Sequence, residues 1–205
     1  MSTTDSPSSI QLERPRRADA LRNYEKVLAA AREAFAEGEE STSLEEIARR
    51  AGVGIGTLYR NFPNRQALLE ALYINEVEEV SSAAAKFADT GRDPWESFAA
   101  WFDQLSGYLA TKRALSAELL NYLEPTAPLF QSCRASLYES GAPLLRQAQD
   151  AGAVRPDVDI ADVMQMVLGI GKIPTGDRAQ VQHLLRIALD GLRYTPQSQP
   201  ARRPN

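Results

Sequence analysis

Basic and polar side chains follow a glycine-rich turn in the segment GVGIGTLYRNFPNR, residues 52–65. Glycines occupy alternate positions at the start of this segment. Tyr59, Arg60 and Arg65 follow them, and each can bind a polyanion. Two kinds of site combine these residue types. One is a phosphate cradle in a nucleotide-binding enzyme, and the other is a turn that leads into a DNA-reading helix.

The spacing around the turn decides between these two sites. A dinucleotide-binding loop needs G-x-G-x-x-G after a β-strand, and a P-loop ends in Gly-Lys-Ser or Gly-Lys-Thr. The chain has G-x-G-x-G, and the spacing Ser43-x-x-Glu46 before it is that of a capping box at a helix start. Ile47, Ala48 and Ala51 give that helix one apolar face. The pattern therefore excludes a phosphate cradle and favours a helix-turn-helix unit.

The turn predicts a short helix after it. Gly52 ends the preceding helix, because glycine adopts the positive φ that such a turn requires. Gly54 is a weak N-cap for a helix over residues 55–62. Leu58 and Phe62 lie four residues apart and point to the core, so the polar side chains of this helix face elsewhere.

Two further helices are predicted on either side. The first runs from Asp19, a candidate N-cap, to a stop at Gly38. The second follows Pro63, which ends the short helix, and Asn64 is its candidate N-cap. Arg65 then lies in the first turn, where free amides and the helix dipole also favour a phosphate.

Composition and charge limit the functional class. The 205 residues carry a formal net charge of -4, which argues against binding nucleic acid by bulk attraction. Residues 1–65 carry 10 basic and 10 acidic side chains, and residues 66–205 carry 13 and 17, so the first part is the better place for a polyanion site. The single cysteine, the lack of an apolar leader and the lack of a membrane-length stretch predict a cytoplasmic protein with no membrane partner.

The run SLEEIARRAGVGIGTLYRNFPNRQALLEAL, residues 43–72, together with the helix before it, resembles the DNA-binding domain of the TetR family of bacterial transcriptional regulators. The resemblance depends on an Ile-Ala helix, an Ala-Gly-Val turn, Gly-Thr-Leu-Tyr, a phenylalanine and a basic residue early in the fourth helix. AGAVRPDVDIADV, residues 151–163, also resembles the joint before the family's penultimate helix. Two positions depart from the pattern: Gly54 replaces a frequent Ser or Thr, and Asn61 replaces a common aromatic residue or His.

The resemblance implies that the helix over residues 55–62 enters the major groove. Thr57 and Asn61 are then candidate base contacts, and asparagine can pair bidentately with adenine. Arg60 has two open roles, guanine recognition and phosphate binding. The candidate backbone contacts are Tyr59, Arg65, Thr42, Ser43 and, in the N-terminal arm, Arg16 and Arg17. Plain packing by Tyr59 and a solvated surface position for the arginines are the alternatives.

The second part of the chain is also predicted to be helical. A helix opens at Pro94, and another amphipathic segment covers residues 115–123. A long helix follows the joint at Pro125 and Pro128, kinks at Pro143 and runs toward residue 152.

The resemblance implies a small-molecule pocket among these middle helices, where an effector shifts the spacing of two DNA-binding heads. Few charges interrupt these stretches, which predicts a mainly apolar or aromatic effector. The same side chains are also typical of an ordinary core. The candidate pocket residues are Trp101, Tyr108, Tyr122, Phe130, Cys133 and Met164.

The last two predicted helices carry apolar residues at helical spacing. The resemblance implies that they form a four-helix bundle with the same helices of a second subunit, and a two-fold dimer matches a palindromic site. The alternative is that they only close the core of one protomer. The candidate interface residues are Val163, Val167, Val181, Leu184, Leu185, Ala188, Leu189 and Leu192.

The sequence thus predicts an all-α protein in four parts. These are a flexible basic arm (1–18), a three-helix DNA-binding domain with a helix-turn-helix (19–72), a helical-bundle effector-binding and dimerisation domain (73–193) and a disordered tail (194–205). The expected function is a homodimeric repressor that leaves double-stranded DNA when it binds a small-molecule effector, with no cofactor or metal. An enzyme is the rival class, but His183 is the only histidine and no catalytic or metal-binding motif is present. A helical dimeric ligand-binding module without specific DNA recognition is the remaining alternative, and salt-dependent DNA binding separates the two.

Overall fold

The computed structural model describes residues 14–15, 18–37, 42–89, 91–173 and 178–193. Within these ranges the chain is all-α, as predicted, and Val154 and Arg193 form one isolated bridge. The helices are α1 (Ala18–Ala36), α2 (Leu44–Ala51), α3 (Ile55–Asn61), α4 (Arg65–Ala88), α5 (Pro94–Leu119), α6 (Pro128–Asp150), α7 (Ile160–Gly171) and α8 (Arg178–Leu192). Arg16, Arg17 and the tail over 194–205 lie outside the described residues.

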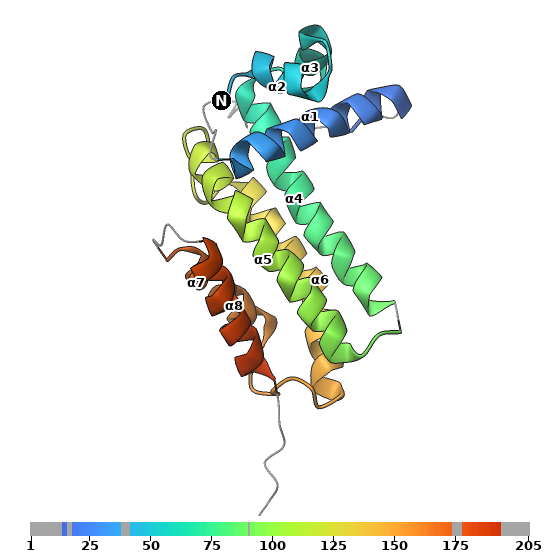
Figure 1. Cartoon of the computed structure of the whole chain (residues 1–205), viewed down its shortest axis with the longest axis vertical. Helices are drawn as coiled ribbons and strands as arrows, with labels where there is room; N and C mark the ends of the chain where they lie inside the picture. The colour runs from blue at the N-terminus through green and yellow to red at the C-terminus, as the bar shows by residue number, and fades with distance from the viewer. Residues whose placement is uncertain (1–13, 16–17, 38–41, 90, 174–177, 194–205) are drawn as a thin grey trace, which may run out of the picture.

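The helices form a small head on a longer bundle (Figure 1). Helices α1, α2 and α3 make the head, and α4 begins there and continues along the bundle beside α5 and α6. Helices α7 and α8 pack against α5, on the side away from α4. Since α1 also packs against α5, the head contacts the bundle through α5 as well as through α4.

Local capping explains how the head folds. The Ser43 Oγ accepts a hydrogen bond from the Glu46 amide at 3.2 Å, which confirms the predicted N-cap of α2. Gly52 ends α2 with φ at 65°, in the left-handed region that favours glycine. Asn64 caps α4 through its Oδ1, which accepts from the Ala67 amide at 2.9 Å. These three caps fix the positions at which the helices of the head begin and end.

The head closes on a small aromatic core. Leu58 and Phe62 are fully buried, as predicted, and the Phe62 ring lies 4.9 Å from the Tyr24 ring of α1. This pair therefore fixes α3 against α1. The exposed face of α3 is held in a defined orientation as a result.

Helix boundaries differ from the prediction at three places. Helix α1 begins at Ala18, so Asp19 lies in its first turn rather than at the N-cap. Its negative charge interacts favourably with the helix dipole there. Helix α3 ends at Asn61, and Phe62 is its C-cap. The separate segment predicted over 115–123 was wrong: α5 continues unbroken to Leu119, because no proline follows Pro94 within it and good helix formers occupy its last turns. Helix α6 likewise continues through Pro143.

A close approach of α5 and α6 holds the bundle together. The fully buried Trp101 donates its indole N–H to the Val80 carbonyl of α4 at 3.2 Å. Gly141 of α6 lies directly against this ring, since a Cβ at that position would come within 2.3 Å of a Trp101 ring atom. The lack of a side chain at Gly141 is therefore a packing requirement.

Candidate DNA-binding surface and effector cavity

The outward face of α3 carries the predicted DNA-contacting residues. Tyr59 and Arg60 are exposed, whereas Thr57 and Asn61 are half-buried. The helix lies at the outer end of the head, beside α2 (Figure 1). A Cβ built on Gly56 would meet no atom within 4 Å, so the protein leaves this part of the backbone open to a ligand.

Hydrogen bonds within α3 hold two of these side chains along the helix. The Arg60 Nε donates to the Gly56 carbonyl at 3.1 Å, and its Nη2 donates to the Thr57 hydroxyl at 3.0 Å. The Asn61 amide donates to the Thr57 carbonyl at 2.9 Å. Contacts with DNA bases would replace these bonds rather than add to unbonded groups.

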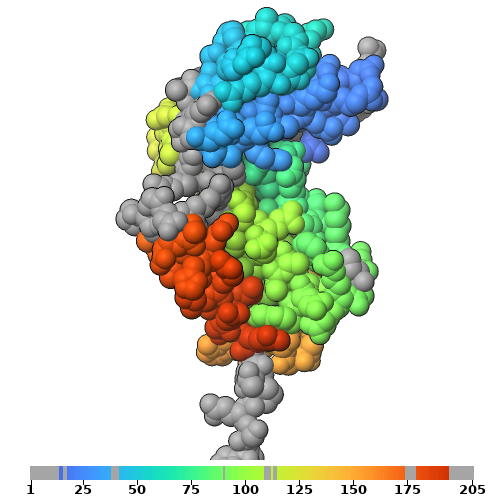
Figure 2. Space-filling view, in the orientation of Figure 1, coloured from blue at the N-terminus to red at the C-terminus, as the bar shows by residue number. Residues whose placement is uncertain are grey.

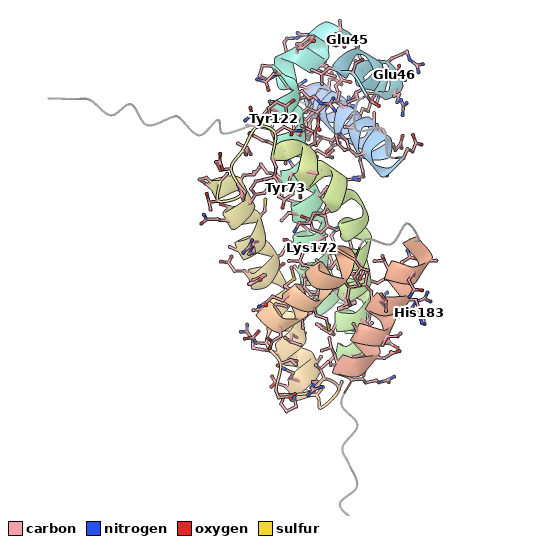
Figure 3. The ribbon with its side chains drawn as sticks, turned by 90° about the vertical axis from the view of Figure 1, so that its left-hand side faces the viewer. Glu45, Glu46, Tyr73, Tyr122, Lys172 and His183 are labelled. Atoms are coloured by element: carbon pink, nitrogen blue, oxygen red, sulfur yellow. The ribbon has the colours of Figure 1, made fainter. Side chains whose placement is uncertain are left out.

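Two acidic side chains at the start of α2, Glu45 and Glu46, each accept hydrogen bonds from the protein. The Tyr59 hydroxyl donates to the Glu45 carboxylate at 3.1 Å, which raises the pKa of Tyr59. Hydrogen bonds from Arg49 and then Arg50 lower the pKa of Glu46 to about 2. Figure 3 shows both glutamates on the head. Because these carboxylates accept hydrogen bonds from the protein, the repulsion that they exert on a phosphate is reduced.

Arg65 occupies the predicted first turn of α4 but has partners that the sequence did not reveal. Its Nε donates to the Glu118 carboxylate of α5 at 3.0 Å, and its Nη1 donates to the Thr42 carbonyl at 2.6 Å. Its guanidinium also lies 6.0 Å from the centre of the Phe35 ring. The half-buried Arg65 therefore connects the start of α2, the end of α1 and the C-terminal part of α5.

A cavity of about 290 Å³ lies between α4, α5, α6 and α7. Four of the six predicted pocket residues line it: Tyr108, Phe130, Cys133 and Met164. Their rings and apolar groups face Tyr73 of α4, whose ring meets the Phe130 ring edge-on at 5.4 Å between centroids. Burial raises the pKa of the Cys133 thiol to about 11, so the thiol stays protonated at neutral pH.

The other two predicted pocket residues lie elsewhere. Trp101 is buried in the packing of α5 against α4 and α6. Tyr122 is 44% exposed in the segment after α5, near the head (Figure 3). Sequence periodicity could not separate Trp101 from the cavity residue Tyr108, because the two lie seven positions apart on the same face of α5.

The cavity wall also carries three cations that no sequence motif indicated. These are Lys112 of α5, Arg134 of α6 and Lys172 at the end of α7. Burial, followed by the charges of Arg134 and Lys172, lowers the pKa of Lys112 to about 8. The cavity is therefore electropositive as well as apolar.

The predicted dimer residues divide into two groups. Four are buried within the protomer and keep almost no surface for a partner: Val163, Val167, Leu185 and Leu192. The other four are half-buried: Val181, Leu184, Ala188 and Leu189. Ile187, which was not predicted, is 54% exposed on α8. Helix α8 forms a broad part of the surface in Figure 2.

This fold and these sites define a helix-turn-helix protein with a ligand-sized cavity in its second domain. The family profile "Bacterial regulatory proteins, tetR family" matches residues 27–72, and the profile "Transcriptional regulator SbtR-like, C-terminal domain" matches residues 93–194. The chain belongs to the TetR family of DNA-binding transcriptional regulators.

Known proteins of similar sequence and structure agree with this assignment. The TetR transcriptional regulator SCO0520 from Streptomyces coelicolor is 36% identical, with a TM-score of 0.74, over 84% of this chain and 99% of that one. A TetR regulatory protein from Mycobacterium vanbaalenii is 33% identical, with a TM-score of 0.71, over 87% of this chain and 99% of that one. The HTH-type transcriptional regulator UidR of Escherichia coli K12 is 28% identical over 71% of this chain and 76% of its own length. Among the described residues, no helix combines the length and apolar character needed to cross a membrane.

Proposed function

We propose that this regulator is a homodimeric repressor that binds a palindromic operator and is released when a small effector occupies the cavity. In this proposal it is a cytoplasmic protein that acts by binding and has no catalytic activity. The observation that carries the proposal is the exposed polar face of α3, held by capped helices at the outer end of the head. A second domain with a ligand-sized cavity supplies a means of regulation.

Helix α3 is proposed to lie in the major groove. Asn61 and Thr57 read base edges there, and Arg60 binds either a guanine or a phosphate. Tyr59, Ser43 and the residues near the start of α2 contact the DNA backbone, and Arg16 and Arg17 add backbone or minor-groove contacts. Two heads related by a two-fold axis then bind half-sites about 34 Å apart, or further apart when the half-sites are more separated.

Base reading by Asn61 can be tested with sequence-selected DNA. We expect Asn61→Ala to relax the preference at one position of each half-site, with a loss of about 1–3 kcal/mol for the preferred base. Gln147→Ala, an exposed change on α6, serves as the control. A binding profile for Asn61→Ala that matches the wild type at every position would refute the assignment.

The dimer is proposed to form through α7 and α8. Because Leu185 is buried within the protomer, a charge there would disturb folding as well as association. Ile187 is the better test: Ile187→Glu adds a charge at an exposed position that the protomer does not need. Sedimentation should show a wild-type dimer and a folded monomeric variant. A dimer of unchanged stability in Ile187→Glu would place the interface elsewhere.

The contact between Arg65 and Glu118 is the proposed link between cavity and head. Ser116 and Leu120 line the cavity on either side of Glu118 in α5 and the segment that follows it. A ligand that displaces this end of α5 therefore moves Glu118, and with it Arg65 and the start of α2. Effector binding and DNA binding become coupled through this contact, since each favours a different position of α5.

A further inference from the structure

The charges of the cavity wall are of one sign. Lys112, Arg134 and Lys172 come from three different helical segments and line the same cavity, and none of its lining residues is an aspartate or glutamate. Among the described residues, no carboxylate forms an ion pair with any of these three cations. A cluster of cations without an acidic partner is unfavourable unless an anion joins it.

Two acidic side chains that act on groups at the cavity already have partners. Glu76 and Glu78 of α4 act electrostatically on groups at the cavity. Glu76 forms an ion pair with Arg32, however, and Glu78 forms one with Arg14 at 2.5 Å. These carboxylates therefore do not supply the counter-charge that the cavity lacks.

The three cations differ in depth. Arg134 and Lys172 are exposed and lie at the mouth, and Figure 3 shows Lys172 midway along the bundle. Lys112 is half-buried, with its Nζ 5.4 Å from the centre of the Tyr108 ring. Its lowered pKa has burial as the largest cause, followed by the charge of Arg134, so its surroundings disfavour the charged form. An anion next to Lys112 would favour that form instead.

The rest of the wall is suited to an apolar body. Tyr73, Phe130, Leu137 and Met164 present rings and hydrocarbon to the same space. The buried Ser116 hydroxyl has no hydrogen-bond partner of ordinary geometry among the described residues, although it lies close enough to lower the pKa of the Tyr73 phenol. The cavity volume of about 290 Å³ is at the lower end of the range for small-molecule sites, which favours a small ligand.

We propose that the cavity binds a small organic carboxylate, with its charged group between Lys112, Arg134 and Lys172 and its apolar body against Phe130 and Met164. This inference rests on the proposed function, because it names the chemical class of the effector. It also narrows the expectation from sequence, which was an apolar or aromatic effector without a stated charge. An aromatic acid and a short acyl acid both match this arrangement of charged and apolar lining residues.

The test compares acids with their neutral counterparts. Benzoate, phenylacetate and hexanoate are each titrated beside the corresponding amide at neutral pH by calorimetry, at up to millimolar concentration, with the full-length protein. Inorganic phosphate, which has charge but no apolar body, is a third arm. We expect at least one acid to bind, its amide to bind at least about 10-fold more weakly, and phosphate not to bind in the cavity.

Variants locate the site of the acid. Lys112→Met and Arg134→Gln should each weaken binding of that acid by about 10-fold or more, because each removes a charged partner. Lys86→Met, an exposed change on α4 outside the cavity, should leave binding unchanged. The proposal is overturned if no acid binds, if amides bind as well as acids, or if the two cavity variants bind like the wild type.

A separate DNA-binding assay distinguishes the two proposals. An acid that binds in the cavity without changing affinity for DNA would support the carboxylate site and refute the effector role. Failure of the unliganded protein to select any DNA sequence would refute the proposed repressor function, while the calorimetric result would still decide the carboxylate site. A protein that binds DNA and responds only to neutral compounds would refute the carboxylate proposal alone.

Discussion

Replacing Lys112 with methionine should stabilise the unliganded protein at neutral pH and remove a pH dependence of its stability. Methionine keeps most of the apolar length of lysine and lacks the charge. In the wild type, burial and the neighbouring cations disfavour that charge in the folded state only. The substitution therefore relieves a cost that the unfolded chain does not carry.

The size of the effect follows from the two pKa values of Lys112. A pKa of about 8 in the folded protein, against a model-compound value of 10.5, corresponds to at most about 3 kcal/mol. Below pH 8 the lysine is protonated in both states, so the full cost is present. Between pH 8 and 10.5 the unfolded state binds more protons than the folded state, and the free energy of unfolding of the wild type rises with pH. The advantage of Lys112→Met should therefore shrink across this window.

Urea unfolding at matched protein concentration measures the difference between variant and wild type. Other groups that line the cavity with Lys112 also titrate or carry charge. The quantity compared is therefore the difference in the free energy of unfolding between variant and wild type at each pH. These groups are Tyr73, Tyr108, Cys133, Arg134 and Lys172. Lys86→Met is the control for a lysine lost from an exposed surface. A Lys112→Met protein that is less stable than the wild type at pH 7, or whose advantage is the same at pH 7 and pH 9.5, would refute the account of this site.

Three further substitutions test the packing, the DNA surface and the link between them. Gly141→Ala should destabilise the fold by about 1–3 kcal/mol in urea unfolding, because the new methyl group meets the buried Trp101 ring; wild-type stability would contradict that packing. Gly56→Ala should stabilise the head by up to about 1 kcal/mol through helix propensity yet weaken DNA binding, and undiminished affinity would show that DNA does not approach this backbone. Glu118→Ala should release Arg65 from α5 toward the DNA, raising affinity for all sequences and steepening the dependence of that affinity on salt by about one counterion; an unchanged salt slope in titrations would count against the link.

Features of the head that depend on neighbouring residues were predictable from sequence. The Ser43 cap, the turn at Gly52 and the Asn64 cap each join atoms within a few residues, so residue type and spacing determine them. The burial of Leu58 and Phe62 followed from helical periodicity for the same reason.

Contacts between distant segments were not predictable in this way. Arg65 and Glu118 are separated by 53 positions, and no local pattern indicates that they meet. Lys112 belongs to no motif in the sequence, and its position precedes the segment that was predicted separately over residues 115–123. In the structure α5 is continuous and positions this side chain at the cavity, which depends on the packing of three other helices.

The division of the dimer residues has the same physical cause. Helical spacing shows that α7 and α8 each have apolar faces, but it does not show which face the protomer itself covers. Packing of α7 within the protomer, against α5, α6 and α8, leaves Val163 and Val167 buried, whereas Ile187 stays exposed. Only the folded arrangement separates an internal apolar residue from one available to a partner.

Selection of bound fragments from genomic DNA by the purified protein tests the central claim most directly. The protein is first unfolded and refolded to remove any bound small molecule, and selection is performed near physiological salt. We predict recovery of an inverted repeat whose half-site centres lie about 34 Å or more apart along the duplex. Recovery of no sequence above background from the refolded dimer, or of a site without two-fold symmetry, would contradict the account.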